Sequence, residues 1–381
     1  MKKALLVTSV ASMIKQFNIP NIRLLSELGY KVTVATNFKS PGSIPDTESK
    51  KLYNDLKKDD INLENISFDR NPLSKNNLKA YRQLKTLIES NHFDIIHCQS
   101  PIGGVLTRIA ARKQNKLNTR IIYTAHGFHF FKGAHFFNWI IYYPIEKILS
   151  YYTDTIITIN EEDYSRAKKF GMNRLEKING IGIEIDKKNI VSFDVESKRE
   201  ELGIPSTSFI VTSVGELNDN KNHKVIINAI AKLENHNIHY VICGQGNLHN
   251  YLHELSVKLN LEKNIHFLGY REDVIEILKV SDCFAFPSKR EGLGIAAIEA
   301  MSVGLPLITS NVHGINDYSI HGVTGYKYSP NDVSGFSEGL NNLINSEEVF
   351  LKNISEYNQL ASKKYDIVEV LNKMETIYSK I

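Results

Sequence analysis

The sequence predicts an α/β protein of two successive domains, each built on a parallel, doubly wound, Rossmann-like sheet. Short β-branched runs alternate with helical stretches along most of the 381 residues, and such alternation is typical of parallel sheets covered by helices. The alternation restarts near residue 208, after a polar stretch that contains glycine and proline. A chain of this length also exceeds what one hydrophobic core usually organises.

The first domain is expected to span residues 1–180. Its buried strands are the apolar runs at 3–9, 31–36, 94–98, 120–125 and 154–160. Helical patterns separate them at 19–28, 78–90 and 102–113. The stretch 9–18 is interpreted as a loop that follows the first strand.

The second domain is expected to span residues 190–360. Its strands are predicted at 208–215, 238–244, 264–269, 283–288 and 305–310, and its helices at 222–234, 248–259, 272–280 and 294–303. Residues 361–381 have helical spacing and should pack back toward the first domain. Ligands of open α/β sheets bind beyond the carboxyl ends of the strands, so two such domains facing a cleft are expected to bind ligands there.

Composition narrows the class of protein. The three cysteines are scattered without a C-x-x-C pair, which favours a reducing, cytoplasmic setting over a disulfide scaffold or a zinc site. No run of apolar residues is long enough to span a bilayer. Residues 1–190 carry 29 Lys and Arg against 18 Asp and Glu, a net charge of +11, while the remainder carries −7. The first half should therefore meet an anionic partner, and no motif indicates nucleic acid.

The segment EGLGIAAIEAM contains two glutamates, Glu291 and Glu299, eight positions apart. Between them, Gly292 and Gly294 precede a helix, where backbone N–H groups and the helix dipole favour a phosphate. Glu299 can accept hydrogen bonds from the two hydroxyls of a ribose, and Glu291 stands where a sugar joined to the phosphate would lie. The pattern indicates a nucleotide-sugar site; the alternative is a tight turn with Glu299 paired to a surface lysine.

With these residues, the chain resembles the retaining glycosyltransferases of family 4, which have the two-domain GT-B fold. The resemblance covers nearly the whole chain and is closest to the branch that builds capsular and exopolysaccharides. Its most specific part runs from Glu291 to the GVTGY segment at 322–326. It implies that Glu299 binds the donor ribose and Glu291 the donor sugar. The loop from Gly292 through Leu293 and Gly294 to Ile295 should meet the sugar and the phosphate.

The resemblance also places further donor-site residues. Lys221 matches a lysine that neutralises the diphosphate, but Glu216 occupies the position of the family's arginine, so His223, Asn218 or loop amides would have to compensate. Further donor-site candidates are Gly215, Gly244, Gly246 and His313. His313 stands in a loop that departs from the family pattern, and it could equally be a surface turn residue.

On the acceptor side, His126 matches a histidine that faces the donor sugar, and a buried structural histidine is the alternative. An imidazole there can hydrogen-bond sugar hydroxyls and organise an oxocarbenium-like transition state. The remaining acceptor-side candidates are Ser9, Ser12, His97 and Gln99. Ser9 and Ser12 could bind an acceptor phosphate at a helix N-terminus.

Half of residues 128–143 are aromatic. Aromatic side chains gather at membrane interfaces, and Lys132 and Lys147 flank the segment. We expect a core helix from Trp139 to Tyr152 and a partly exposed loop at 128–138 that dips into the inner membrane surface, helped by the basic first domain.

These observations predict a cytoplasmic, peripheral membrane enzyme that transfers a sugar from a UDP-sugar to a polyprenyl-diphosphate-linked saccharide. The catalytic residues would be His126, Glu291 and Lys221. Because no D-x-D motif stands near the diphosphate loops, no cofactor and no essential metal are expected. Two alternatives stay open: a UDP-sugar 2-epimerase-like isomerase, and a catalytically degenerate partner subunit of a glycosyltransferase.

Overall fold

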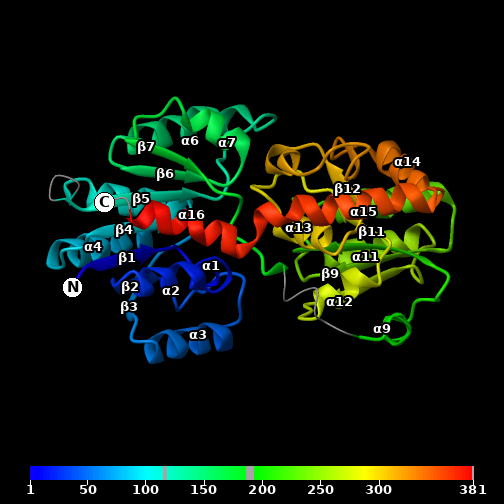
Figure 1. Cartoon of the computed structure of the whole chain (residues 1–381), viewed down its shortest axis with the longest axis horizontal. Helices are drawn as coiled ribbons and strands as arrows, with labels where there is room; N and C mark the ends of the chain where they lie inside the picture. The colour runs from blue at the N-terminus through cyan, green and yellow to red at the C-terminus, as the bar shows by residue number, and fades with distance from the viewer. Residues whose placement is uncertain (115–117, 186–192, 380–381) are drawn as a thin grey trace. The chain divides into compact units, whose positions relative to one another are not determined.

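The computed structural model describes residues 1–114, 118–185 and 193–379 and divides the chain into two compact units. Unit 1 comprises Met1–Ile181 together with the chain from Val368 onward, and unit 2 comprises Gly182–Ile367. The last helix, α16 (Ile367–Ser379), therefore falls almost wholly in the first unit although it ends the sequence (Figure 1).

Unit 1 contains a seven-stranded, entirely parallel sheet in the order β3-β2-β1-β4-β5-β6-β7. Its strands are β1 (Lys3–Val7), β2 (Lys31–Thr36), β3 (Asn62–Asn65), β4 (Ile95–Gln99), β5 (Arg120–Ala125), β6 (Thr155–Thr158) and β7 (Arg174–Lys177). Its other helices are α1 (Ala11–Phe17), α2 (Ile19–Glu27), α3 (Asp46–Lys58), α4 (Lys75–Ser90), α5 (Pro101–Ala111), α6 (Phe136–Ser150) and α7 (Glu161–Ala167).

Unit 2 contains a six-stranded, entirely parallel sheet in the order β10-β9-β8-β11-β12-β13. Its strands are β8 (Phe209–Val214), β9 (Ile238–Cys243), β10 (Ile265–Gly269), β11 (Cys283–Phe286), β12 (Leu307–Ser310) and β13 (Gly325–Tyr328). Its helices are α9 (Val195–Glu201), α10 (His223–Leu233), α11 (His249–Lys258), α12 (Val274–Lys279), α13 (Ile295–Ser302), α14 (Val333–Ile344) and α15 (Glu348–Ser362), with 3-10 turns η2 (His313–Asp317) and η3 (Lys363–Tyr365).

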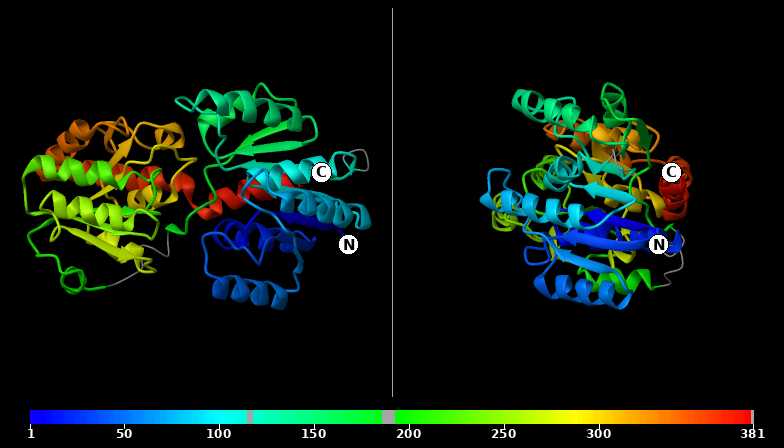
Figure 2. Two further views of the ribbon diagram at one scale, coloured as in Figure 1. Left: turned by 180° about the vertical axis from the view of Figure 1, so that it is seen from behind. Right: turned by 90° about the vertical axis from the view of Figure 1, so that its left-hand side faces the viewer.

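The predicted fold class is confirmed, since each unit is a parallel α/β sheet with helices packed on its faces (Figure 2). The central strands are buried along their whole length, as β4 and β9 illustrate. Strands buried on both faces are mostly apolar, which is why their runs stand out in the sequence. Polar side chains begin several helices; for example, Asp332 caps α14 by accepting a hydrogen bond from the Gly335 amide.

Two expected boundaries were wrong. The stretch 9–18, interpreted as a loop, contains helix α1, whose Ile14 is fully buried in the core. The aromatic helix begins at Phe136 rather than Trp139, because His135 caps it by accepting a hydrogen bond from the Phe137 amide. Both helices are therefore longer than their apolar patterns indicated.

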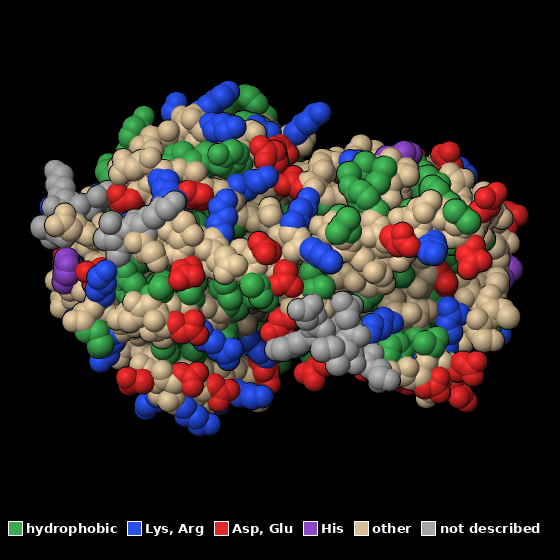
Figure 3. Space-filling view, viewed as in Figure 1, with side chains coloured by type: hydrophobic (Ala, Val, Ile, Leu, Met, Phe, Trp, Pro, Cys, Tyr) green, Lys and Arg blue, Asp and Glu red, His purple; other side chains and the backbone are tan. Residues whose placement is uncertain are grey.

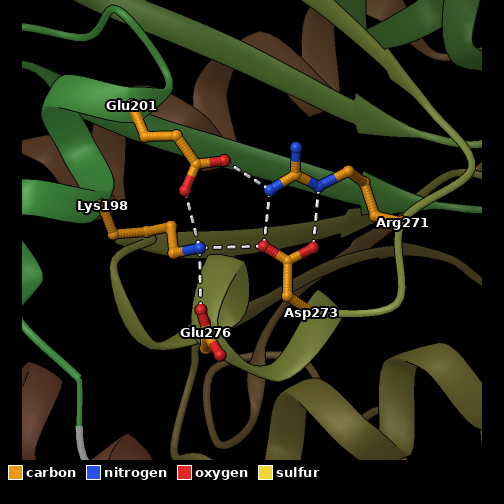
Figure 4. Close-up of polar contacts among 5 residues, drawn as sticks. All are labelled: Lys198, Glu201, Arg271, Asp273 and Glu276. Carbon is orange, nitrogen blue, oxygen red and sulfur yellow. Dashed lines mark hydrogen bonds and ion pairs between the residues drawn. The ribbon is translucent and has the colours of Figure 1, made fainter.

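Beyond the domain boundary, an ion-pair network fastens α9 to the loop before α12 and to α12 itself (Figure 4). The Lys198 ammonium lies 2.8 Å from Glu201, 2.9 Å from Asp273 and 2.7 Å from Glu276. Arg271 lies 2.6 Å from Glu201. The hydrogen bonds that Lys198 donates to Glu201, Glu276 and Asp273 raise its pKa. The network fixes the start of the second unit against the sheet that carries the donor loops.

Candidate functional site

In unit 2 the loop that follows β8 and the loop that follows β11 are joined by hydrogen bonds. Asn222, in a left-handed conformation, donates from its side-chain amide to the carbonyls of Pro287 and Pro330. The Lys289 amide donates to the Asn220 carbonyl, and the Asn220 side chain donates to the Arg290 carbonyl. These bonds cross about seventy positions of sequence and hold Lys221 against the segment that contains Glu291. The sequence gives no signal for the role of Asn222.

Lys221 and Glu291 form an ion pair with 2.6 Å between Nζ and Oε2. Both side chains are about four-fifths buried, with 21% and 20% exposed. The Lys221 ammonium also lies 4.7 Å from the centre of the Phe286 ring. Lys221 is therefore no solvated loop lysine. The structure brings together the two residues predicted to meet the diphosphate and the donor sugar.

Gly294 is the N-cap of α13 and has a φ of +91°, a conformation that favours glycine. A Cβ there would lie 2.5 Å from the Phe286 ring and 2.9 Å from the Tyr318 hydroxyl. The Tyr318 hydroxyl is buried and has no hydrogen-bond partner among the described residues, and burial, with the nearby Glu291 charge, raises its pKa well above the usual value. Sequence reasoning missed this tyrosine.

The turn η2 packs directly against the donor loop. The Gly314 amide donates to the Glu291 carbonyl, 3.1 Å away, and a Cβ on Gly314 would lie 1.9 Å from the Gly292 carbonyl oxygen. His313, next to it, is buried and has a φ of +41°. The alternative of a surface turn residue is therefore wrong for His313, which lies behind the loop that joins Glu291 to α13.

The glycines at 215, 244 and 246 allow two loops to touch. A Cβ on Gly244 would lie 1.9 Å from the Gly215 carbonyl oxygen, and one on Gly246 would lie 2.4 Å from the Leu217 carbonyl oxygen. The Gly215 amide donates to the Cys243 carbonyl, and the Leu217 amide donates to the Gln245 carbonyl. This close packing by itself requires glycine, whether or not a nucleotide also lies there.

The remaining donor-side candidates occupy different environments. Glu299, on α13, is half-buried, Leu293 is buried and Ile295 begins the helix. Glu216 is exposed. His223 cannot replace the missing arginine, because it is buried beside the Tyr240 hydroxyl and burial, with Lys221 nearby, lowers its pKa to about 4. Because the His223 imidazole is neutral, Lys221 is the cation that this loop places against Glu291.

In unit 1, His126 belongs to a chain of side-chain hydrogen bonds. Its Nε2 lies 2.7 Å from Oε1 of Gln99, whose Nε2 donates to Oδ1 of Asn18 at 2.5 Å. Because the Gln99 amide nitrogen is turned to Asn18, His126 donates through Nε2, and this fixes its tautomer. Burial lowers the pKa of His126 to about 4, so the ring is neutral. Asn18 lies 81 positions from Gln99 and could not be inferred from the sequence.

His97 uses both ring nitrogens inside unit 1. Nδ1 lies 2.8 Å from the Tyr378 hydroxyl of α16, and Nε2 lies 2.8 Å from Oγ1 of Thr124. Burial and the neighbouring His126 lower its pKa to about 3. His97, Gln99 and His126 line a cavity of about 10 Å³ beside α16, which has room for a single water. His97 thus ties the last helix to the first sheet.

Ser9 and Ser12 have internal partners for their amides. The Ser9 amide donates to Oγ of Ser100, and the Ser12 amide donates to the carbonyl of Pro41. Both residues are buried. The amides of both residues therefore already have partners within unit 1, and binding of an acceptor phosphate by Ser9, Ser12 and the helix N-terminus stays a prediction.

The 128–138 stretch is partly exposed, as expected: Phe128, Phe130 and Phe131 are buried, whereas Phe136 and Phe137 are exposed. The helix expected to be mostly core instead exposes half of its side chains. Phe130 packs against Trp139, Tyr143 and Phe170, so distant partners decided which aromatic rings turn inward.

Family comparisons agree with this two-unit architecture. The model described as Glycosyl transferase 4-like matches residues 5–160, and the model described as Glycosyl transferases group 1 matches residues 194–361. The structure of Anabaena Alr3699/HepE in complex with UDP and glucose aligns over 100% of both chains with a TM-score of 0.79 and 18% identity, which speaks for the fold alone. Fold and loops together define a GT-B glycosyltransferase.

Relatives of known sequence specify the family further. The chain is 34% identical over 383 residues to EpsD of Bacillus subtilis (strain 168), whose name places it among the glycosyltransferases, with 99% of this chain and 96% of EpsD covered. It is 29% identical to the Escherichia coli UDP-Gal:alpha-D-GlcNAc-diphosphoundecaprenol alpha-1,3-galactosyltransferase, with 79% of each chain covered. The chain belongs to this glycosyltransferase family, and its relatives include polysaccharide and capsule enzymes.

Proposed function

We propose that this glycosyltransferase moves a sugar, with retention of configuration, from a UDP-sugar to a polyprenyl-diphosphate-linked saccharide during capsular or exopolysaccharide synthesis. The observation that carries the proposal is the contact between Lys221 and Glu291 beside the N-terminus of α13. It joins a cation suited to a diphosphate with a carboxylate suited to sugar hydroxyls. The names of the relatives support the donor and the acceptor, since one contains UDP-Gal and a diphosphoundecaprenol saccharide.

In the proposed reaction the acceptor hydroxyl attacks the anomeric carbon from the face that UDP leaves. The bond between that carbon and the β-phosphate oxygen breaks, and the β-phosphate takes the proton of the hydroxyl. Lys221 and the amides of the Gly292–Gly294 loop stabilise the charge that develops on the leaving diphosphate. Catalysis then depends on positioning and electrostatics and needs no protein nucleophile.

Each remaining residue receives a role that follows from its surroundings. Glu299 accepts hydrogen bonds from the donor ribose. His126, held neutral and in one tautomer by Gln99, offers a hydrogen bond to a sugar hydroxyl. No essential metal is needed, because Lys221 and the α13 amides compensate the diphosphate. The protein would work at the cytoplasmic face of the membrane, where lipid-linked saccharides are exposed.

The test is release of UDP from a panel of UDP-sugars, with and without a polyprenyl-diphosphate saccharide and with and without EDTA. Acceptor-dependent release that withstands EDTA supports the proposal. Formation of an epimer without acceptor would instead identify the isomerase. If UDP is released from none of the sugars, the chain is a subunit that has lost catalysis. The exposed Glu216 in place of an arginine is the feature that favours this alternative.

A further inference from the structure

The half of helix α6 that faces away from the core of unit 1 is apolar except for Lys147. At 3.6 residues per turn, the exposed side chains of α6 fall on one contiguous half of the helix, and the half-buried and buried ones fall on the other. We call the exposed apolar side chains the α6 outer face; they are Phe136, Phe137, Ile140, Ile141, Ile145 and Ile148. Contiguous apolar surfaces of this kind are rare on soluble monomers and mark an interaction site.

The orientation of α6 is fixed by contacts on its inner side. Glu146 lies 2.8 Å from the fully buried Arg108, whose guanidinium stands 3.8 Å from the centre of the Tyr123 ring. Trp139 and Tyr143 pack against Phe130 on the same side. Turning the α6 outer face inward would strip Arg108 of its carboxylate partner, which is costly for a buried charge. The outer face is therefore a permanent feature of the folded domain.

The exposed charges within α6 and the segment before it are basic. Between His126 and Thr153 the chain contains three charged side chains: Lys132, Glu146 and Lys147. Glu146 is buried against Arg108, whereas both lysines are exposed. Lys147 is the one charged residue within the exposed half of α6. Figure 3 shows further lysine and arginine side chains, together with acidic ones, over the margin of the domain where α6 and α7 lie.

We propose that the α6 outer face docks into the surface of an anionic lipid bilayer, with α6 lying in the plane of the interface. Apolar area with basic charge at its edge is what interfacial helices use. Protein interfaces of ordinary composition instead mix in many polar groups, which this face lacks. The fifteen residues of α6 are too few to cross a bilayer, and none of the helices within the described residues is long and apolar enough to do so.

This inference rests on the proposed function for its purpose, since a lipid-linked acceptor is reached from the membrane surface. It narrows the expectation that the 128–138 segment enters the lipid. Of that segment's phenylalanines, Phe128, Phe130 and Phe131 are buried in the core, whereas the exposed Phe136 and Phe137 belong to the α6 outer face.

The experiment measures flotation of the full chain with vesicles of phosphatidylcholine alone and with phosphatidylglycerol added. The test variant is Phe137→Gln/Ile141→Gln/Ile148→Gln, which changes side chains that are 62%, 50% and 58% exposed. The matched control is Val257→Gln/Val349→Gln/Leu360→Gln on α11 and α15, where the exposures are 45%, 68% and 67%. We expect the wild type and the control to bind anionic vesicles, and the test variant to bind at least about tenfold more weakly.

Lys132→Gln/Lys147→Gln should reduce binding to the anionic vesicles and leave binding to the neutral ones unchanged. The unfolding temperature of the test variant should equal that of the wild type, because the altered side chains are exposed. If it falls, the single variant Ile141→Glu takes its place, with the same expected loss of flotation.

Equal flotation of the test variant and the wild type would overturn the inference. So would a wild type that does not bind to anionic vesicles. A wild type that is dimeric in solution, and a test variant that is monomeric but still floats, would assign the face to a second copy of the chain. UDP binding by calorimetry is measured in parallel. If the test variant loses vesicle binding but still binds UDP, the result bears on the α6 outer face and not on the donor site. If the wild type binds no UDP, the proposed function is contradicted.

Discussion

Replacing Glu291 by Gln should strengthen the binding of UDP and weaken the turnover of UDP-sugar. In the empty site the Glu291 carboxylate lies 2.6 Å from the Lys221 ammonium. A diphosphate that needs this ammonium must first compete with the carboxylate. Glutamine keeps the shape and a carbonyl oxygen but removes the charge, so Lys221 becomes available without loss of packing.

The size of the effect follows from the burial of the pair. Both side chains are about one-fifth exposed, so solvent screens their attraction only in part. Measured values for such pairs, net of desolvation and side-chain entropy, reach about 1 kcal/mol. UDP should therefore bind about fivefold more tightly to Glu291→Gln. Loss of charged hydrogen bonds to the donor sugar, each worth about 1.5–3 kcal/mol, should lower kcat/KM by about tenfold or more.

Calorimetry with UDP and steady-state kinetics with the UDP-sugar give the two numbers. The matched control is Asp219→Asn, which removes a carboxylate of the same loop that lies 2.6 Å from Lys289. If the control tightens UDP as much as Glu291→Gln does, the net charge of the loop is responsible and the ion pair is not. UDP affinity that falls or stays constant in Glu291→Gln would refute competition for Lys221.

Three further predictions address ribose binding by Glu299, the hydrogen bonds that link His126, Gln99 and Asn18, and the dependence of stability on pH. Glu299→Ala should weaken UDP by about 1.5–3 kcal/mol in calorimetry, through lost ribose hydrogen bonds, and an unchanged affinity would remove that role. Asn18→Ala should free Gln99 to turn and lower kcat by about tenfold, with UDP binding unchanged; a kcat equal to the wild type would show that the tautomer of His126 is not set this way. Acid should destabilise the fold, because His97 and His223 have pKa values of about 3 and about 4, and the unfolded chain takes up those protons near pH 6.5. This contribution to the free energy of unfolding is complete above pH 6.5 and is lost as pH falls from there toward 4. The loss is about 2 kcal/mol for each histidine at pH 5. Urea unfolding with the same midpoint at pH 7 and pH 5 would contradict the prediction.

The sequence was informative wherever burial was complete. Strands β1, β4, β5, β8 and β9 are mostly apolar and were predicted within one or two residues. Three strands were not identified: β3 (NLEN), β7 (RLEK) and β13 (GYKY). Each lies at the edge of its sheet. An edge strand is bonded on one side and tolerates polar residues, so its sequence lacks the apolar run that marks a central strand.

The site could be predicted only as far as its local motifs extended. Glu291, Gly294 and Lys221 were found because glycine and charge at a strand-to-helix turn carry chemical meaning of their own. Their pairing could not be predicted, because it depends on Asn222, whose side chain reaches carbonyls 65 and 108 positions away. The orientation of α6 likewise depends on Arg108, a residue of another helix, and composition alone could not tell that one half of this helix is exposed.

The contact between Lys221 and Glu291 also bears on release of the product. A transferase must hold a UDP-sugar firmly and then let UDP go. With a sugar attached, Glu291 can turn to its hydroxyls and leave Lys221 to the diphosphate. After transfer the sugar is gone, and the carboxylate again competes for the ammonium. An arginine at position 216 would hold UDP independently of this exchange, whereas the exposed glutamate there would repel the diphosphate. Under the proposed function, Glu291 would thus weaken UDP relative to UDP-sugar, and Glu216 would weaken the diphosphate of both.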